Sequence, residues 1–190
     1  MSRLNTVCVF CGSSPGNSPE FAAAARSLGN EVAARGIGLV YGGASVGLMG
    51  VVADAALEGG GRATGVITES LAGHEIAHGT LSDLQVVRTM HERKARMAEL
   101  SDAFIMLPGG FGTYEEFMEA VTWAQLGIHD KPCGILNVDG FYDHLLTFLG
   151  QATDMGFIKP PQMARLVVAG EAGTLLDAMG AGPVEGDHPA

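Results

Sequence analysis

The chain has 190 residues, 47% of them hydrophobic and 17% charged, which is typical of one globular domain with a sizeable core. Its formal net charge of −10 argues against nucleic acid and anionic membranes as partners, because both are themselves polyanions. No apolar run reaches the roughly 18–20 residues of a membrane span, and three cysteines cannot form a disulfide framework, so we expect a cytoplasmic protein.

Short apolar runs alternate with helical patterns along the chain. Ser18 and Pro19 mark the start of the first helix, and Gly127 marks the end of a later one. The predicted strands cover residues 6–11, 37–41, 63–67, 84–87, 103–107, 133–136 and 166–168, and the predicted helices cover 19–35, 46–58, 90–100, 113–126, 142–153 and 174–179.

This alternation of fully apolar strands with helices predicts a mainly parallel sheet with helices on both faces. Right-handed crossovers then give a doubly wound, Rossmann-like α/β fold that binds ligands at the carboxyl ends of the strands. We expect a single domain over residues 1–180, followed by a loose tail over 181–190.

The most informative segment is Pro-Gly-Gly-Phe-Gly-Thr-Tyr-Glu-Glu, which runs from Pro108 to Glu116 between a predicted strand and a predicted helix. A glycine turn at a helix start is an anion site, because backbone N–H groups lack partners there and the helix dipole adds positive charge. The same turn carries Glu115 and Glu116, which a phosphate cradle alone does not need. They indicate chemistry beside a bound phosphate.

Two further glycine turns follow the first two predicted strands, one at residues 12–14 and one at 42–50. Turns at the carboxyl ends of parallel strands share one edge of the sheet, so these turns are expected to converge on the same ligand. The alternative is that any α/β protein uses glycine at such turns. The run at 42–50 does not fit the dinucleotide fingerprint in register, which argues against a redox cofactor.

Glu116 has two interpretations. Thr113 and Glu116 fit a capping box, which would stabilise the helix by about 1 kcal/mol and requires no catalysis. Alternatively, the helix dipole holds an ionised Glu116 beside the ligand, where it could stabilise a developing cation or activate water.

The predicted helix over 90–100 supplies cations, among them Arg93, Lys94 and Arg96. They could form a solvated basic face. Alternatively, because this helix begins at the carboxyl end of a strand, it could aim Arg93 at the site, where the guanidinium would orient Glu116 or bind the ligand. Cys8 and Cys11 lie three apart in a predicted strand and face opposite sides, so no metal site is expected.

Four motifs together resemble the LONELY GUY family of cytokinin riboside 5′-monophosphate phosphoribohydrolases. The family pattern PGGxGTxxE is met at every fixed position from Pro108 to Glu116, and the similarity spans roughly residues 6–170. The other motifs are Met-His-Glu-Arg-Lys at 90–94, Val-Tyr-Gly-Gly at 40–43 and Cys-Val-Phe-Cys-Gly-Ser-Ser at 8–14. Such proteins are often labelled lysine decarboxylases, but the context of a pyridoxal phosphate lysine is not found here.

The resemblance implies hydrolysis of the N-glycosidic bond of a nucleoside 5′-monophosphate, either N6-prenylated AMP or AMP itself, to free base and ribose 5-phosphate. It implies a homodimer or larger assembly, and no metal or organic cofactor is required. It places catalysis on Arg93 and Glu116. It carries substrate contacts over to Glu75, Arg93, Lys94, Gly110, Phe111, Gly112, Thr113, Tyr114, Glu115, Glu116 and Thr122, to which the glycine turns add Gly12, Ser13, Gly42, Gly43 and Gly109.

A non-catalytic carrier of a nucleotide-like ligand is the alternative, because molybdenum-cofactor carrier proteins are similar in fold and in their glycine turns. A carrier needs the phosphate turn but not both Arg93 and Glu116, so their joint presence favours the enzyme. The sequence leaves the preferred base open.

Overall fold

The computed structural model describes residues 4–72, 78–79 and 81–180. Within these ranges seven strands form one sheet, and every neighbouring pair is parallel, as predicted. The sheet order is β4-β3-β2-β1-β5-β6-β7. The strands are β1 (Thr6–Phe10), β2 (Gly38–Tyr41), β3 (Ala63–Thr68), β4 (Asp83–Val87), β5 (Ala103–Met106), β6 (Cys133–Leu136) and β7 (Leu166–Ala169).

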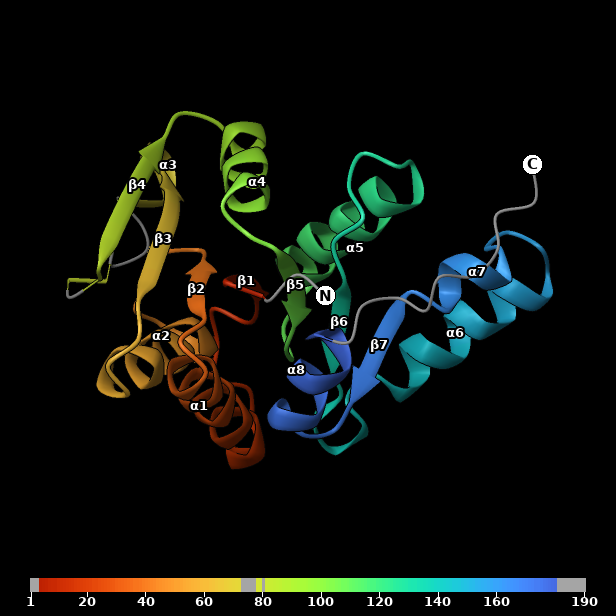
Figure 1. Ribbon diagram of the computed structural model, residues 1–190, viewed down its shortest axis with the longest axis horizontal. Coiled ribbons are helices and arrows are strands. Elements are labelled where there is room, and N and C mark those ends of the chain that lie inside the picture. The colour runs from red at the N-terminus through yellow and green to blue at the C-terminus, as the bar shows by residue number, and fades with distance from the viewer. Residues whose placement is uncertain (1–3, 73–77, 80, 181–190) are drawn as a thin grey trace.

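Helices cover both faces of this sheet (Figure 1). One face packs against α1 (Pro19–Ala34), α2 (Gly47–Glu58) and α8 (Ala172–Gly180). The other packs against α4 (Met90–Glu99), α5 (Phe111–Gln125) and α6 (Asp143–Asp154). The remaining helices among the described residues are α3 (Glu69–Ala72), α7 (Pro160–Met163) and a short 3-10 helix, η1 (Val138–Gly140). All three are single turns that the sequence patterns did not predict. The doubly wound α/β fold is therefore confirmed.

Side-chain alternation along β1 divides the core into two clusters. Val7, Val9 and Cys11 join the cluster under α1 and α2, whereas Cys8 and Phe10 join the cluster under α4 and α5. Cys8 and Cys11 thus lie on opposite faces, as the period of two predicts. Both are free thiols buried in apolar surroundings.

The order of the strands explains where a site can form. From β1 the chain builds outward through β2 and β3 to β4, and then returns to the other side of β1 to build β5, β6 and β7. Because the order of the strands in the sheet reverses beside β1, a crevice opens at the carboxyl ends of the adjacent strands β2, β1 and β5. The three glycine turns follow these strands.

Several predicted element boundaries are confirmed. The side chain of Ser18 accepts a hydrogen bond from the backbone N–H of Glu20 and caps α1. Gly127 follows α5 with a φ of 72°, the left-handed conformation that ends a helix. The predicted tail over 181–190 lies outside the described residues. No helix among the residues described is long and apolar enough to cross a membrane.

Candidate active site

The three glycine turns meet backbone to backbone at the carboxyl edge of the sheet. The N–H of Gly12 donates to the carbonyl of Pro108 over 3.0 Å, and Gly12 in turn accepts from the N–H of Leu48 over 3.0 Å. Gly47 has a φ of 58°, and a Cβ there would lie 2.3 Å from the backbone of Ser13. The turns therefore meet as predicted, and glycine is required where the backbones touch; that they bind one ligand stays a prediction.

The helix α5 begins two residues earlier than predicted, and the proposed capping box is wrong. Gly110 is the N-cap and makes no side-chain capping bond, so Thr113 and Glu116 occupy the first turns of the helix. Thr113 is buried, and its Oγ1 would lie 2.1 Å from a Cβ on Gly109. Thr113 therefore packs under the glycine turn, and Glu116 is released from the capping role.

The start of α5 is open on its outer side. The first intrahelical bond runs from the N–H of Tyr114 to the carbonyl of Gly110, so the N–H groups of the three preceding residues precede the helical ladder. A Cβ built on Gly110 or Gly112 would meet no atom within 4 Å, and Phe111 is 93% exposed. Packing within the chain thus leaves space beside these glycines for an anion.

The pair Arg93–Glu116 forms the buried centre of the site. Nη1 of Arg93 lies 2.5 Å from Oε1 of Glu116, and the two side chains are only 7% and 12% exposed. The guanidinium also donates through Nε to the carbonyl of Val66 over 2.9 Å and through Nη2 to the carbonyl of Gly42 over 3.5 Å. Strand β3 and the turn after β2 therefore hold Arg93 in place, and Arg93 holds Glu116.

Burial raises the pKa of the Glu116 carboxyl above its ordinary value, while the charge of Arg93 acts in the opposite direction. Desolvation thus opposes the helix dipole that we expected to hold Glu116 ionised. The neighbouring guanidinium is the main charge that favours the carboxylate. A carboxyl with a raised pKa next to an arginine is suited to exchanging a proton with water.

A second ionic cluster lies beside the first and is more open to solvent. Nζ of Lys94 lies 2.5 Å from Oε1 of Glu115 and 3.1 Å from Oε2 of Glu119. Burial lowers the pKa of Lys94, but its two carboxylate partners outweigh this and the net pKa is raised. The amine is therefore a cation at neutral pH. The alternative of a solvated basic face is wrong for both Arg93 and Lys94, because both point toward α5.

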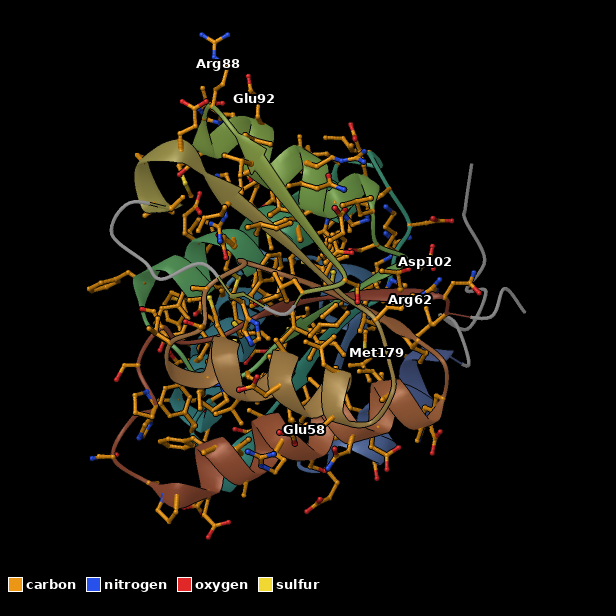
Figure 2. All side chains as sticks on the ribbon, turned by 90° about the vertical axis from the view of Figure 1, so that its left-hand side faces the viewer. Glu58, Arg62, Arg88, Glu92, Asp102 and Met179 are labelled. Atoms are coloured by element: carbon orange, nitrogen blue, oxygen red, sulfur yellow. The ribbon has the colours of Figure 1, made fainter. Side chains whose placement is uncertain are left out.

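Local capping fixes the point at which α4 begins and therefore the position of Arg93. The side chain of Thr89 accepts from the N–H of Glu92, and Oε2 of Glu92 accepts from the N–H of Thr89 and of Arg88. Arg88 and Glu92 lie at the outer end of this helix (Figure 2). The Thr-x-x-Glu pattern at 89–92 is readable in the sequence, although the capping box was assigned to the wrong helix.

One expected substrate contact, Thr122, lies apart from this cluster, and another, Glu75, is not described. Glu75 falls outside the residues that the structure describes. Thr122 lies on the exposed side of α5, where its hydroxyl donates to the carbonyl of Met118 over 2.7 Å, and it borders an apolar cavity of ≈ 330 Å³ next to β6 and β7. Because a helix rises 1.5 Å per residue, Thr122 is about 9 Å along the axis from Glu116.

Tyr142, which the sequence patterns did not single out, contacts the turn from behind. Its buried hydroxyl donates to the carbonyl of Leu107 over 2.6 Å, and its ring packs edge-on against Tyr114 with the centroids 6.1 Å apart. Tyr142 comes from the start of α6, and neither its spacing nor its residue type marks it as part of the site.

Comparison with known sequences agrees with the motifs. The family model described as "Possible lysine decarboxylase" matches residues 49–179. Two Arabidopsis thaliana proteins named cytokinin riboside 5′-monophosphate phosphoribohydrolase are 55% and 50% identical to the chain. The first alignment covers 88% of this chain and 76% of the relative, and the second covers 94% and 84%.

Comparison with solved structures identifies the same fold in more distant proteins. A molybdenum cofactor binding protein from Rippkaea orientalis superposes with a TM-score of 0.71 at 22% identity, covering 95% of this chain and 98% of that one. The molybdenum cofactor carrier protein of Chlamydomonas reinhardtii gives a TM-score of 0.69 at 21% identity, covering 93% and 96%. At such identities the likeness shows the fold alone.

The sequence relatives are much closer than the structural neighbours, and they match nearly the full chain. The matched region includes the paired carboxylate and guanidinium that a carrier does not need. The chain therefore belongs to the LONELY GUY family, the phosphoribohydrolases within the group described as possible lysine decarboxylases.

Proposed function

We propose that the protein hydrolyses the N-glycosidic bond of nucleoside 5′-monophosphates, releasing the free base and ribose 5-phosphate. The observation that carries this proposal is the buried pair of Arg93 and Glu116 beside an open glycine turn. The relatives, at 50–55% identity, bear the name of this activity. N6-prenylated AMP is the substrate that their name indicates, and AMP is the simplest substrate of the same chemistry.

The phosphate end of the substrate is assigned to the start of α5. The free N–H groups at Phe111, Gly112 and Thr113 and the dipole of a 15-residue helix favour a phosphate there. Gly12, Ser13, Gly42 and Gly43 come from the adjoining turns and would line the same crevice. Holding the phosphate uses binding energy remote from the reacting bond to position the sugar.

The reaction itself is assigned to Glu116. When the C1′–N bond breaks, its electron pair leaves with the base, which takes up a proton, and positive charge develops on the ribose ring. A carboxylate next to that ring stabilises the cation, and it can accept the proton that the attacking water loses as its oxygen bonds to C1′. Arg93 positions this carboxylate, because the other N–H donors of its guanidinium are bound to the carbonyls of Val66 and Gly42.

A turnover assay separates the enzyme from a carrier. The protein is incubated with a large excess of AMP or N6-prenylated AMP, and base and ribose 5-phosphate are measured by chromatography. Many equivalents of both products per protein support the hydrolase. Binding of the nucleotide at one equivalent per chain, with no products, would instead support the carrier and would remove the role proposed for Glu116.

We also propose a homodimer in a reducing cytoplasm. The exposed side of α5 that carries Thr122 is the surface on which we place the second protomer, so that Thr122 contacts the partner's substrate. Leu126 and Ile128, which follow Thr122 in the chain at the end of α5, are large apolar side chains left exposed. Three free buried thiols fit a reducing compartment. Light scattering should give twice the chain mass of 19.6 kDa, and a monomer would contradict the proposal.

A further inference from the structure

The regular pairing of β1 with β5 breaks where the glycine turn begins. Phe10 pairs with Met106, and the N–H of Leu107 donates to the carbonyl of Phe10 over 2.9 Å, as in a parallel ladder. A continued ladder would bring the N–H of Gly12 to the carbonyl of Leu107. Instead that N–H donates to the carbonyl of Pro108, one residue later.

This slip by one residue leaves the carbonyl of Leu107 without its ladder partner. The next residue is Pro108, which has no N–H and directs the chain out of the strand. A buried carbonyl needs a hydrogen-bond donor, because an unpaired one costs about 1–3 kcal/mol. The hydroxyl of Tyr142 supplies that donor over 2.6 Å.

Tyr142 is itself held firmly in place. Its ring is 1% exposed, and its backbone N–H donates to Oδ1 of Asn137 over 2.8 Å. Nδ2 of Asn137 donates to Oδ1 of Asp143 over 2.7 Å, which orients the amide. Burial raises the pKa of the Tyr142 hydroxyl well above its ordinary value, so the group stays a neutral donor.

The same ring also reaches the far side of the glycine turn. It packs edge-on against Tyr114, in the first turn of α5 and two residues before Glu116. Tyr142 thus contacts the chain just before Pro108 and again just after Thr113. The residues between these contacts are those assigned to the phosphate.

We propose that Tyr142 is a positioning residue for this site. Its hydroxyl donates a hydrogen bond to the carbonyl of Leu107, which has lost its partner in the ladder, and this bond fixes the turn that binds the substrate phosphate. This inference rests on the proposed function, which assigns the glycine turn to binding of the substrate phosphate. The proposed role of Tyr142 does not extend to the Arg93–Glu116 pair. The carbonyls of Val66 and Gly42 hold Arg93, and neither contact involves Tyr142.

The test is Tyr142→Phe, which removes the hydroxyl and keeps the ring. Tyr41→Phe is the matched control, since Tyr41 is also buried at the end of a strand and its hydroxyl has no hydrogen-bond partner within the described residues. Hydrogen–deuterium exchange of the ligand-free protein should show faster exchange at the hydrogen-bonded N–H groups of Gly12 and Tyr114 in Tyr142→Phe and no such change in Tyr41→Phe. The KM for AMP should rise about 10-fold while kcat changes less than about three-fold.

Two outcomes would overturn the proposal. One is wild-type exchange at the N–H groups of Gly12 and Tyr114 in Tyr142→Phe. The other is a lower melting temperature with unchanged KM, which would make the hydroxyl merely structural. The exchange measurement needs no turnover, so it decides the positioning role even if the wild-type protein releases no base, a result that would count against the hydrolase alone.

Discussion

Two ionic clusters join the same pair of helices, and they differ in their access to water. Arg93 and Lys94 are adjacent on α4, and each contacts a glutamate of α5 at 2.5 Å. Glu116 is 12% exposed and its arginine is also bound to two backbone carbonyls, whereas Glu115 is 54% exposed. Equal distances therefore do not mean equal roles. We propose the inner pair as the catalytic unit, whereas the outer cluster forms a charged rim that faces solvent.

The largest expected effect is on turnover when the inner carboxylate is lost. Glu116→Gln should lower kcat for AMP by about 1,000-fold or more, since the neutral amide can neither stabilise the developing cation nor accept a proton from water. The amide oxygen can still accept from Arg93, so circular dichroism should show a folded protein. A folded Glu116→Gln variant with wild-type kcat would contradict the catalytic assignment.

The next effect is on stability when the inner cation is removed. Arg93→Ala leaves Glu116 and the carbonyls of Val66 and Gly42 without their donor, so urea unfolding should show a loss of about 3–5 kcal/mol. Arg96→Ala is the matched control on the same helix, because Arg96 is 41% exposed where it pairs with Glu99. That change should cost less than about 1 kcal/mol. An equal loss of unfolding free energy in both variants would mean that the buried pair stabilises the fold no more than an exposed ion pair does.

A third effect is the response to pH. Because burial raises the pKa of Glu116, kcat/KM should fall on acidification at a pH above the ordinary carboxyl value of 4.5. The sign for stability is opposite. A carboxyl whose pKa is higher in the folded state stabilises the fold below its ordinary pKa and loses that contribution as the pH rises through the folded value. The stability advantage of wild type over Glu116→Gln should therefore shrink as pH increases through this range.

The smallest effect is expected in the outer cluster. Glu119→Gln leaves Lys94 with Glu115 as its partner, so the free energy of unfolding should change by less than about 0.5 kcal/mol. The kcat for AMP should stay within about two-fold of wild type. A loss comparable to that of Glu116→Gln would erase the distinction between the two clusters.

The fold could be predicted from the sequence because most of its strands are largely apolar and its turns are rich in glycine. The start of α5 could not be placed, since Thr113 and Glu116 fit a capping box that tertiary packing overrides. Thr113 is buried under Gly109, which leaves the N-cap to Gly110. Local sequence patterns therefore predict a helix end well only where tertiary packing does not bury the residues that would form the cap.

The partners of the site were harder to predict than its residues. Arg93 and Glu116 were identified by motif and chemistry, but the acceptors that fix Arg93 are 27 and 51 residues away, at Val66 and Gly42. Tyr142 is 35 residues from the carbonyl that it binds. Such contacts depend on how strands align in the sheet, and no local spacing reports that alignment.

The near absence of solvent around Arg93 and Glu116 has a consequence for ionic strength. Dissolved ions screen charges that face water and hardly reach a pair enclosed by protein. Added salt should therefore weaken the capture of an anionic nucleotide at the open start of α5 while leaving the inner pair intact. In concentrated salt the protein should need more substrate to reach half its maximal rate, and that maximal rate should hardly move.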